Sequence, residues 1–463
     1  MRAATIPVWS RLGPLARGLV VFTACYIVLN FVQYYVVHHV STLNFSRQFL
    51  LWHRLDAEDS WEPMQYALQY FLSGGDKTIY QAVFFDQLSK FQYPPLSLIL
   101  IWPFAKLPYH IETSNVTLNV TSWFAVLITA VTVAAIFDAA CRRHLPKASL
   151  ALRPERQLGW MLCGVLTIGY LPIVHAYHFG QIQSWIDCLF AIVVLAWMTE
   201  RKALAGFVAA LICVIKPQLG LLLVWGALRR EWRFTLWFLG AGIVFIALSI
   251  AIFGVDNNLD YLRVLSFLST HGESLTLNQS FNGLMNRLLH NGTILFDEYV
   301  NLPPGKWVPP YNRWVHIGTL ASTVAIVGAA LFWRAREHGR SGLADLMIMA
   351  LSLTIASPIA WTYHYGLLLP MFAFALPATL ASNRLGKGSI VVLAVAFVLT
   401  GSFFFNEVEP LTYTPFNPLI SYMYFGGLLL LWQLYRLRSV QYQEGRAPAH
   451  AAGADPMPAA GRG

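Results

Sequence analysis

The segment AGFVAALICVIKPQLGLLLVWGALRREW, residues 205–232, places a single lysine between two apolar runs. Pro217 follows Lys216 directly and interrupts helical hydrogen bonding at that point. A bare ammonium at membrane depth is destabilising unless it reaches the interface or meets an anion. The segment therefore predicts a helical hairpin whose tip, Lys216-Pro217-Gln218, lies near the lipid headgroups. There Lys216 either anchors the hairpin to the headgroups or binds the phosphate of a lipid substrate.

The whole chain has the composition of a polytopic membrane protein. Of its 463 residues, 56% are hydrophobic and 12% are charged, whereas soluble domains carry about 25% charged residues. The net charge of +9 is explained by basic residues beside the ends of apolar runs, so it does not indicate nucleic acid as a partner. The five cysteines lie in apolar segments without a CxxC pattern, which predicts buried thiols rather than disulfides or a metal site.

The basic residues predict the topology, because short cytoplasmic loops concentrate Arg and Lys. They cluster at Arg11 and Arg17, Arg142 and Arg143, Arg201 and Lys202, Arg229 and Arg230, Arg334 to Arg340, Arg384 and Lys387, and Arg436 and Arg438. With every cluster in the cytoplasm, about twelve transmembrane segments alternate and both termini lie inside. The expected spans are 18–39, 117–141, 158–176, 183–200, 203–215, 218–228, 233–254, 313–334, 342–358, 364–382, 388–405 and 418–436.

Two long loops are then extracytoplasmic, residues 40–93 and 255–312. The apolar stretch 94–108 is too short and too interrupted by proline for a normal span, so we expect a re-entrant or interfacial helix beneath the first loop. In this interpretation residues 1–440 form one integral-membrane domain. The Ala/Pro/Gly-rich segment 441–463 is expected to be a disordered cytoplasmic tail.

The unusual polar residues gather on the outer side of this topology. A pore or carrier more often places ionisable groups along the midplane of its spans, so the one-sided clustering favours an outward-facing active site. In the first loop, Asp56, Glu58 and Asp59 are candidates for base catalysis or metal binding, although a solvated acidic cluster has the same pattern. His364 lies among aromatic residues near a span boundary, where it either binds a ligand or belongs to the interfacial aromatic belt.

Several motifs, in this order, resemble one family. They are Asp59 in the first outer loop, GGDKTIY (74–80), FQYPPLSLIL (91–100), GQIQ (180–183), IKPQ (215–218) with LRREW (228–232), NQSFNGLMNRL (278–288) and ASPIAWTYHYG (356–366). The chain resembles the GT-C type of polyprenol-phosphate-dependent glycosyltransferases, specifically the alpha-mannosyltransferase-like glycosyltransferase family 87. It departs from the family pattern in two places. The family often has Asn at the position of Gln183, and the spacing around Asp59 differs.

The resemblance implies a GT-C fold and a membrane hexosyltransferase. Such an enzyme moves a hexose, most often mannose, from a polyprenyl-phosphate donor to a glycolipid or glycan acceptor on the outer face, with inversion at the anomeric carbon. The implied partners are that donor, that acceptor and membrane lipid, with no nucleic acid. No cofactor and no nucleotide-sugar site are implied, while a divalent metal stays an open alternative. The implied location is a bacterial inner (plasma) membrane.

The resemblance also implies roles for individual residues. Asp59 would be the catalytic base, with Glu58 and Glu62 as rivals because the spacing differs there. Lys216 and His364 would bind the donor phosphate, assisted by Arg287 and Gln181. The groove for the sugar or lipid would be lined by Trp61, Tyr93, Gln183, Asn282, Trp361 and Tyr363.

Other classes of function fit the same topology. A transporter or flippase for lipid-linked sugars would share the spans and the basic groove but would not need Asp59. A non-catalytic membrane scaffold fits poorly, because it gives no reason for Asp, Lys, His, Gln and Trp to gather on one side. Replacement of Asp59 therefore separates an enzyme from a carrier.

Overall fold

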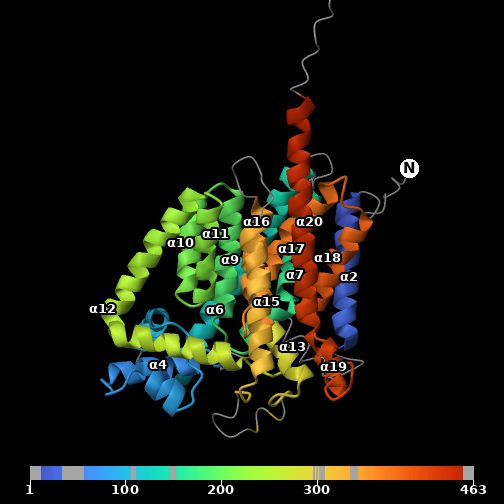
Figure 1. The fold of residues 1–463 in the computed structure, drawn as a ribbon. Coiled ribbons are helices and arrows are strands. Elements are labelled where there is room, and N and C mark those ends of the chain that lie inside the picture. The colour runs from blue at the N-terminus through green and yellow to red at the C-terminus, as the bar shows by residue number, and fades with distance from the viewer. Residues whose placement is uncertain are drawn as a thin grey trace, which may run out of the picture.

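The computed structural model describes residues 12–33, 57–105, 111–145, 153–295, 298, 301, 308–333 and 342–451. Over these residues the chain is helical, and the sole pairing of strand type is an isolated bridge between Asn278 and Trp361. The expectation of an all-α membrane protein is confirmed at this level. Element labels are those of Figure 1.

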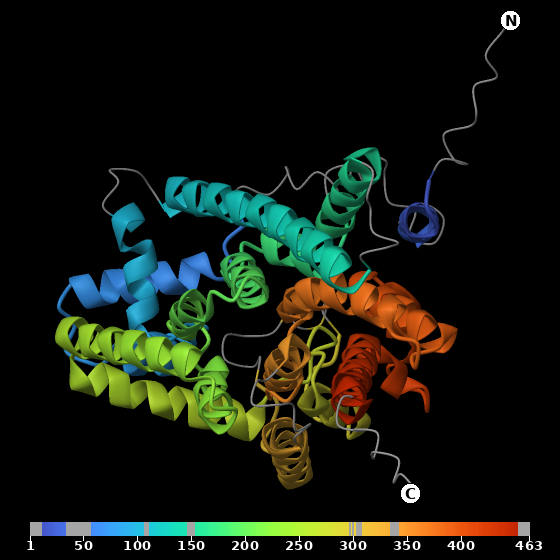
Figure 2. The ribbon, with the colours of Figure 1, turned by 90° about the horizontal axis from the view of Figure 1, so that it is seen from above.

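Most helices pack side by side into a bundle, and the shorter ones cover only part of its length (Figure 1). The helices of the bundle are α2 (Pro14–Val32), α6 (Ile111–His144), α7 (Arg153–Ile168), α8 (Leu171–His178), α9 (Gln183–Met198), α10 (Lys202–Cys213), α11 (Leu221–Leu228), α12 (Trp232–His271), α15 (Arg313–Phe332), α16 (Leu343–Ile355), α17 (Leu368–Ala381), α18 (Lys387–Gly401) and α20 (Tyr422–Ala451). Seen from above, α6 crosses the bundle and packs against α7, α9 and α17 (Figure 2).

Shorter elements join these helices, most of them at the end opposite the α20 terminus (Figure 1). They are α4 (Trp61–Leu72), η2 (Tyr80–Asp86), η3 (Pro95–Ser97), α5 (Leu98–Ala105), η4 (Pro217–Gly220), α13 (Phe281–Leu288), η5 (Thr362–Leu367), α19 (Phe405–Val408), η6 (Glu409–Leu411) and η7 (Asn417–Ser421). The stretch expected as a re-entrant or interfacial helix contains η3 and α5.

Helix length supports fewer crossings than the charge pattern predicts. Each of the twelve expected spans contains a helix. However, only five helices in the described part of the chain are long and apolar enough to cross a membrane, or up to seven if two bent pairs each count as one span. The count of twelve is therefore not confirmed. The short helices α10 and α11 explain much of the gap, because 12 and 8 residues at about 1.5 Å each fall below the roughly 30 Å of a hydrocarbon core.

Basic clusters from distant parts of the sequence meet at one end of the bundle. Asp345 of α16 accepts a hydrogen bond from Arg229 Nε at 2.5 Å and forms a second ion pair with Arg438 of α20. Arg436 Nη1 donates to Ser389 Oγ of α18 at 3.0 Å. Buried charges need such partners, because an unpaired one is strongly destabilising. The sequence predicted that the basic clusters lie on the same side of the membrane. Three of them do lie at the same end of the bundle.

Helix α12 changes direction at the opposite end. Gly254 has φ 78° and ψ 165°, which breaks the helix into two segments. The second segment, residues 255–271, belongs to the expected second loop but is helical, and in Figure 1 it crosses beneath the bundle near α4. It is fastened to the first loop, because Asn257 Oδ1 accepts the Ile79 backbone N–H at 2.7 Å. The two predicted outer loops thus fold against each other.

The C-terminal helix is longer than expected. α20 continues to Ala451, into the segment expected as a tail, so the disorder of that tail stays a prediction. The remainder of the predicted tail, 452–463, lies outside the described residues.

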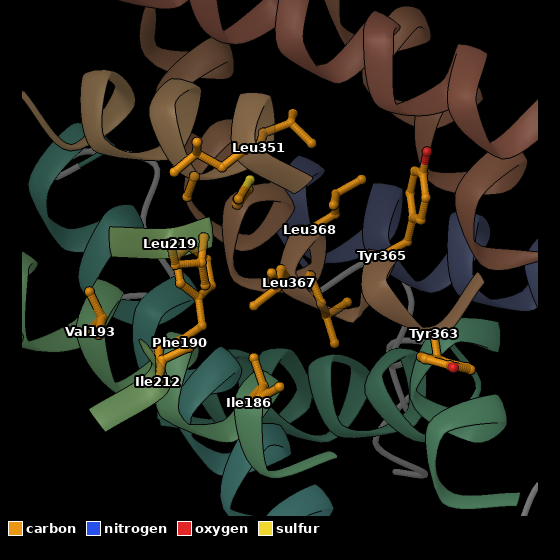
Figure 3. Close-up of a cluster of buried hydrophobic side chains, with 14 of the residues drawn as sticks. Ile186, Phe190, Val193, Ile212, Leu219, Leu351, Tyr363, Tyr365, Leu367 and Leu368 are labelled. Carbon is orange, nitrogen blue, oxygen red and sulfur yellow. The ribbon is translucent and has the colours of Figure 1, made fainter. Parts of the chain in front are cut away.

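The buried core reaches the hairpin tip. Figure 3 shows Ile186 and Phe190 of α9 facing the η4 residue Leu219 and the η5 residue Leu367. All four side chains are buried. This apolar packing fixes η4, which follows Lys216, and η5, which carries His364, against α9.

Candidate functional site

A pocket of about 270 Å³ lies where η4, η5, the loop before α9 and the second segment of α12 converge. Seven residues predicted for the site line it: Tyr93, Gln181, Gln183, Lys216, Trp361, Tyr363 and His364. The wall from α12 adds Tyr261, Leu265, Leu268 and Ser269. The lining therefore combines polar and cationic side chains with the apolar side chains of Leu265 and Leu268.

Asp59 is held at the edge of this pocket by the loop around Gly180. The Asp59 backbone N–H donates to Phe179 O at 3.0 Å, and the Ser60 N–H donates to Gly180 O at 3.2 Å. Gly180 has φ +66°, and a Cβ there would lie 2.3 Å from Ala57 O. Only glycine fits this close approach without displacing the backbone.

The amide of Gln181 connects Asp59 to the pocket lining. Its Nε2 donates a hydrogen bond to the Asp59 carboxylate, and its Oε1 accepts from Ser60 Oγ at 2.6 Å. Ser60 Oγ also lies 2.8 Å from the Tyr93 hydroxyl. These bonds fix the carboxylate beside two residues that line the pocket. Gln181 is thus positioned to orient Asp59 rather than to bind phosphate alone.

The pKa of Asp59 is raised above its ordinary value, chiefly because surrounding protein displaces water. Lys90 opposes this shift, and so does the Gln181 hydrogen bond, whereas Glu273 and Glu62 reinforce it. The side chain nevertheless remains open to solvent. A carboxylate that is accessible yet poorly hydrated is a stronger proton acceptor than a free one.

The rival acids face other parts of the molecule. Glu58 accepts a hydrogen bond from Asn115 Nδ2 of α6 at 2.9 Å. Glu62 accepts from the Tyr66 hydroxyl at 3.0 Å on the exposed side of α4. Asp59, by contrast, is bonded to Gln181 of the pocket wall.

Lys216 lies at the tip of the hairpin, between α10 and η4, and its side chain lines the pocket. Burial lowers the pKa of Lys216 to about 7, and the negative charge of Asp187 partly opposes this shift. Among the described residues its ammonium has no hydrogen-bond or ion-pair partner. A cation held without a partner in a pocket is suited to binding an anion.

His364 presents one ring nitrogen to the same pocket. Its Nδ1 accepts the Trp361 backbone N–H at 3.2 Å. This bond places the proton of the neutral ring on Nε2, which can then donate to an anion. Lys216 acts electrostatically on His364, so the two predicted phosphate-binding groups lie close together.

The model of glycosyltransferase family 87 matches residues 91–358, more than half of the chain. The chain belongs to glycosyltransferase family 87. It is therefore a glycosyltransferase, and its apolar helices make it an integral membrane protein. The matched residues include the hairpin of Lys216 and the GQIQ motif, whereas Asp59 precedes the match and His364 follows it.

Two curated relatives show which enzymes this chain is similar to. The chain is 23% identical over 339 residues to the polyprenol-phosphate-mannose-dependent alpha-(1-2)-phosphatidylinositol pentamannoside mannosyltransferase of Mycolicibacterium smegmatis, covering 70% of this chain and 73% of the relative. It is 26% identical over 299 residues to the polyprenol-phosphate-mannose-dependent alpha-(1-2)-phosphatidylinositol mannoside mannosyltransferase of Mycobacterium tuberculosis, covering 64% of this chain and 62% of the relative. The matched part thus spans less than two thirds of the second relative.

Three residues predicted for the site of this family 87 protein are structural by their placement. Trp61 is fully buried, and its Nε1 donates to Asn119 Oδ1 at 2.8 Å, so it does not line the groove. Arg287 is also fully buried and donates from Nη1 to Leu275 O and Asn278 O, both at 2.9 Å. Asn282 Oδ1 accepts the Glu273 backbone N–H at 3.2 Å.

The structure adds an ion pair to the site that the sequence did not reveal. Glu273 accepts from Lys90 Nζ at 3.2 Å and from Trp361 Nε1 at 2.5 Å. Its side chain is 2% exposed and that of Lys90 is 19% exposed. Both charges act on Asp59. Arg287 and Asn282 therefore contribute indirectly, since they hold the loop that carries Glu273.

This ion pair gives two opposite pH predictions for the reaction. Lys90→Met removes a cation that lowers the pKa of Asp59, so the acidic limb of the rate profile should move to higher pH. Glu273→Gln removes an anion that raises this pKa, so the limb should move to lower pH. Transfer rates measured from pH 5 to 9 test both variants. Shifts in the same direction would show that the pair does not tune Asp59.

Proposed function

We propose that the protein is a mannosyltransferase that moves mannose, a hexose, from a polyprenyl-phosphate donor to a glycolipid or glycan acceptor on the extracytoplasmic face. The observation that carries this proposal is the unpartnered ammonium of Lys216, which lines the same pocket as His364 and Gln181. The names of the two relatives support mannose and the lipid-phosphate donor.

The proposed mechanism is a single displacement. The acceptor oxygen forms a bond to the anomeric carbon while its proton passes to Asp59. The bond between the anomeric carbon and the phosphate oxygen breaks, and its electron pair leaves with the polyprenyl phosphate. Lys216 and His364 would stabilise the charge that develops there. Attack from the side opposite the leaving phosphate inverts the anomeric centre.

The pocket shape supports a lipid-linked donor. Its lining holds Lys216 and His364, and the second segment of α12 adds Leu265 and Leu268. A phosphate would fit against Lys216 and His364. The start of a polyprenyl chain would fit against Leu265 and Leu268. Within the described chain, no three His, Cys, Asp or Glu side chains are grouped to hold a metal ion. Lys216 and His364 would supply charge stabilisation to the leaving phosphate.

We further propose the twelve-crossing topology, with both termini in the cytoplasm of a bacterial cell and the pocket facing outward. The basic clusters at Arg229, Arg384 and Arg438 lie at the same end of the bundle, and this arrangement supports the proposed topology. The short hairpin of α10 and α11 would then start and end on the cytoplasmic side, with Lys216 at the tip that points toward the outer face.

Single-cysteine labelling tests this topology. In a background without native cysteines, an impermeant reagent should label positions 59 and 216 on intact spheroplasts, and position 230 only after lysis. The physical reason is that basic loops are retained in the cytoplasm. Labelling of position 230 from outside, with none at 59, would contradict the orientation and the outward-facing site.

The function is tested with purified protein in nanodiscs and a panel of radiolabelled donors. Polyprenyl-phosphate mannose should transfer its sugar to a phosphatidylinositol mannoside acceptor, with a chelator present, while GDP-mannose should not. Absence of transfer from every lipid-linked donor, together with donor movement between leaflets in vesicles, would favour a flippase instead.

A further inference from the structure

A second pocket, of about 440 Å³, lies between α2, α6, α7, α17 and α18. Among the described residues, every side chain that lines it is apolar, for example Phe22 of α2, Leu376 of α17 and Phe397 of α18. It shares no lining residue with the pocket of Lys216. This lateral pocket is therefore separate from the candidate active site.

Helix α2 forms one wall of the lateral pocket and stands at the edge of the bundle (Figure 1, Figure 2). Near its start, the Gly13 backbone N–H donates to Glu155 Oε1 of α7 at 2.6 Å. Further along, the Tyr26 hydroxyl contacts the carbonyl oxygens of Gly169, at 3.0 Å, and of Gly401. These polar contacts hold α2 in place on both sides of the apolar space. Because protein interiors are close-packed, a space of this volume calls for an occupant.

The length of the lateral pocket corresponds to one leaflet of a bilayer. On α17 its lining runs from Leu369 to Leu380, and these two residues are about 16 Å apart along the helix at about 1.5 Å per residue. The hydrocarbon core of a bilayer is about 30 Å thick, so the pocket extends through about half of it. Apolar cavities stay free of water, whereas a lipid acyl chain of one leaflet matches both the chemistry and the length.

The lateral pocket opens at the end of the bundle where the basic clusters meet. At this end Arg436 donates to Ser389 of α18. Pro14 and Leu380 line the pocket at the same end and are exposed. Because basic residues concentrate beside the ends of membrane spans, the opening lies at the level of the lipid headgroups.

Two cations lie beside this opening. Lys387 begins α18 three residues before the lining residue Ile390, so both project from the same face of that helix. Arg143, in the last turn of α6, precedes the lining residue Leu145 by two positions. Both cationic side chains are exposed, and neither has a hydrogen bond or an ion pair within the described part of the chain. Basic side chains placed in this way between transmembrane helices bind anionic lipid headgroups.

We propose that the lateral pocket binds one acyl chain of an anionic phospholipid, whose phosphate lies against Lys387 and Arg143. In the topology proposed above, this lipid belongs to the cytoplasmic leaflet. The site goes beyond the proposed function, because sugar transfer is assigned to the opposite end of the bundle and uses neither cation. The acyl chain fills the space between α2 and α18 and supplies the packing contacts that these helices do not make with each other.

Gly18→Phe tests the occupant of the lateral pocket. Gly18 lines the pocket and a Cβ there would meet open space, so a phenyl ring would occupy the place of the acyl chain. Native mass spectrometry of the full-length protein in mild detergent should show one retained phospholipid in the wild type and none in Gly18→Phe. The matched control is Gly240→Phe on α12, where a Cβ also meets open space but the residue does not line the pocket. It should retain the lipid.

The charge of the headgroup is tested by titrating phosphatidylglycerol and phosphatidylcholine into delipidated protein. Phosphatidylglycerol should bind more tightly, and Lys387→Gln should weaken its binding about fivefold, the effect of one basic residue near anionic lipid. Phosphatidylcholine should bind equally to both proteins. The control Lys77→Gln removes an exposed cation that is paired with Asp86, and it should leave the binding of both lipids unchanged.

Three results would overturn the inference. They are lipid retention by Gly18→Phe equal to that of Gly240→Phe, equal affinity of the wild type for the two lipids, and lipid binding that appears only after residues 1–11 are removed. The last result would make that N-terminal segment the occupant. All these measurements are made without the sugar donor, so a failure of sugar transfer would leave the lipid site intact.

Discussion

Asp59→Asn should lower the rate of sugar transfer by about 10²–10⁴-fold while donor affinity stays near the wild-type value. Asparagine keeps the size of the side chain, but it cannot take the proton of the acceptor hydroxyl. A sugar hydroxyl is far too weak an acid to ionise near neutral pH, so transfer needs an acceptor for that proton as the new bond forms. Single-turnover transfer and donor binding, measured on the same preparation, separate the two effects.

The neighbouring acids supply the controls for this experiment. Glu58→Gln and Glu62→Gln should retain most of the activity, because Glu58 is bonded to Asn115 and Glu62 to Tyr66. An inactive Glu58→Gln or Glu62→Gln beside an active Asp59→Asn would show that the base is assigned wrongly. Three active variants would favour a carrier over an enzyme.

The pH dependence of the wild-type transfer rate gives an independent test of Asp59 as the base. The base works when it is deprotonated, so the rate should rise as pH increases through the pKa of Asp59. Because burial raises this pKa, the acidic limb should lie at higher pH than that of a solvated aspartate. Asp59→Asn should lose this limb together with most of its activity.

Lys216→Ala is expected to weaken donor binding and transfer together by about tenfold to a hundredfold, since a charge-assisted contact contributes roughly 1.5–3 kcal/mol. Lys216→Arg should be only partly active, because its planar fork presents the charge differently. Donor affinity in the wild type should also fall as pH rises above about 7, where the free Lys216 begins to lose its proton. Arginine at this position should flatten that dependence.

The matched control for Lys216 is Lys77→Ala, since Lys77 lies on the exposed outer surface, paired with Asp86 at 2.7 Å. Its removal should leave donor affinity near the wild-type value. Unchanged donor affinity in Lys216→Ala would reduce Lys216 to an anchor for lipid headgroups, the alternative that the sequence left open.

The sequence indicated the hairpin where a local break marks it, because Pro217 follows Lys216 directly. Gln181 was predicted to assist phosphate binding, and its hydrogen bond to Asp59 was not foreseen. Trp61 was assigned wrongly because its side chain faces α6 rather than the loop, a choice that helix orientation makes and motif order does not reveal. Arg287 was predicted to bind the donor phosphate, but its guanidinium is buried and bonded to backbone carbonyls. The sequence around such an arginine has the same pattern as the sequence around a ligand-binding one.

Glu273 could not be found from the sequence. Glu273 is a single acid in a long polar loop, and it reaches Asp59 only because α12 bends at Gly254 and passes beneath the hairpin. The number of crossings stays a prediction, since charge alternation cannot tell a short hairpin from two complete helices.

The most direct test is a cryo-EM structure of the protein with a non-hydrolysable polyprenyl C-phosphonate mannose. The phosphonate should lie against Lys216 Nζ and His364 Nε2, with the anomeric carbon turned toward Asp59 and the first isoprene units against Leu265 and Leu268. A phosphonate bound elsewhere, for example at the exposed basic surface of Lys77 and Arg263, with the pocket beside Asp59 empty, would contradict the proposed active site.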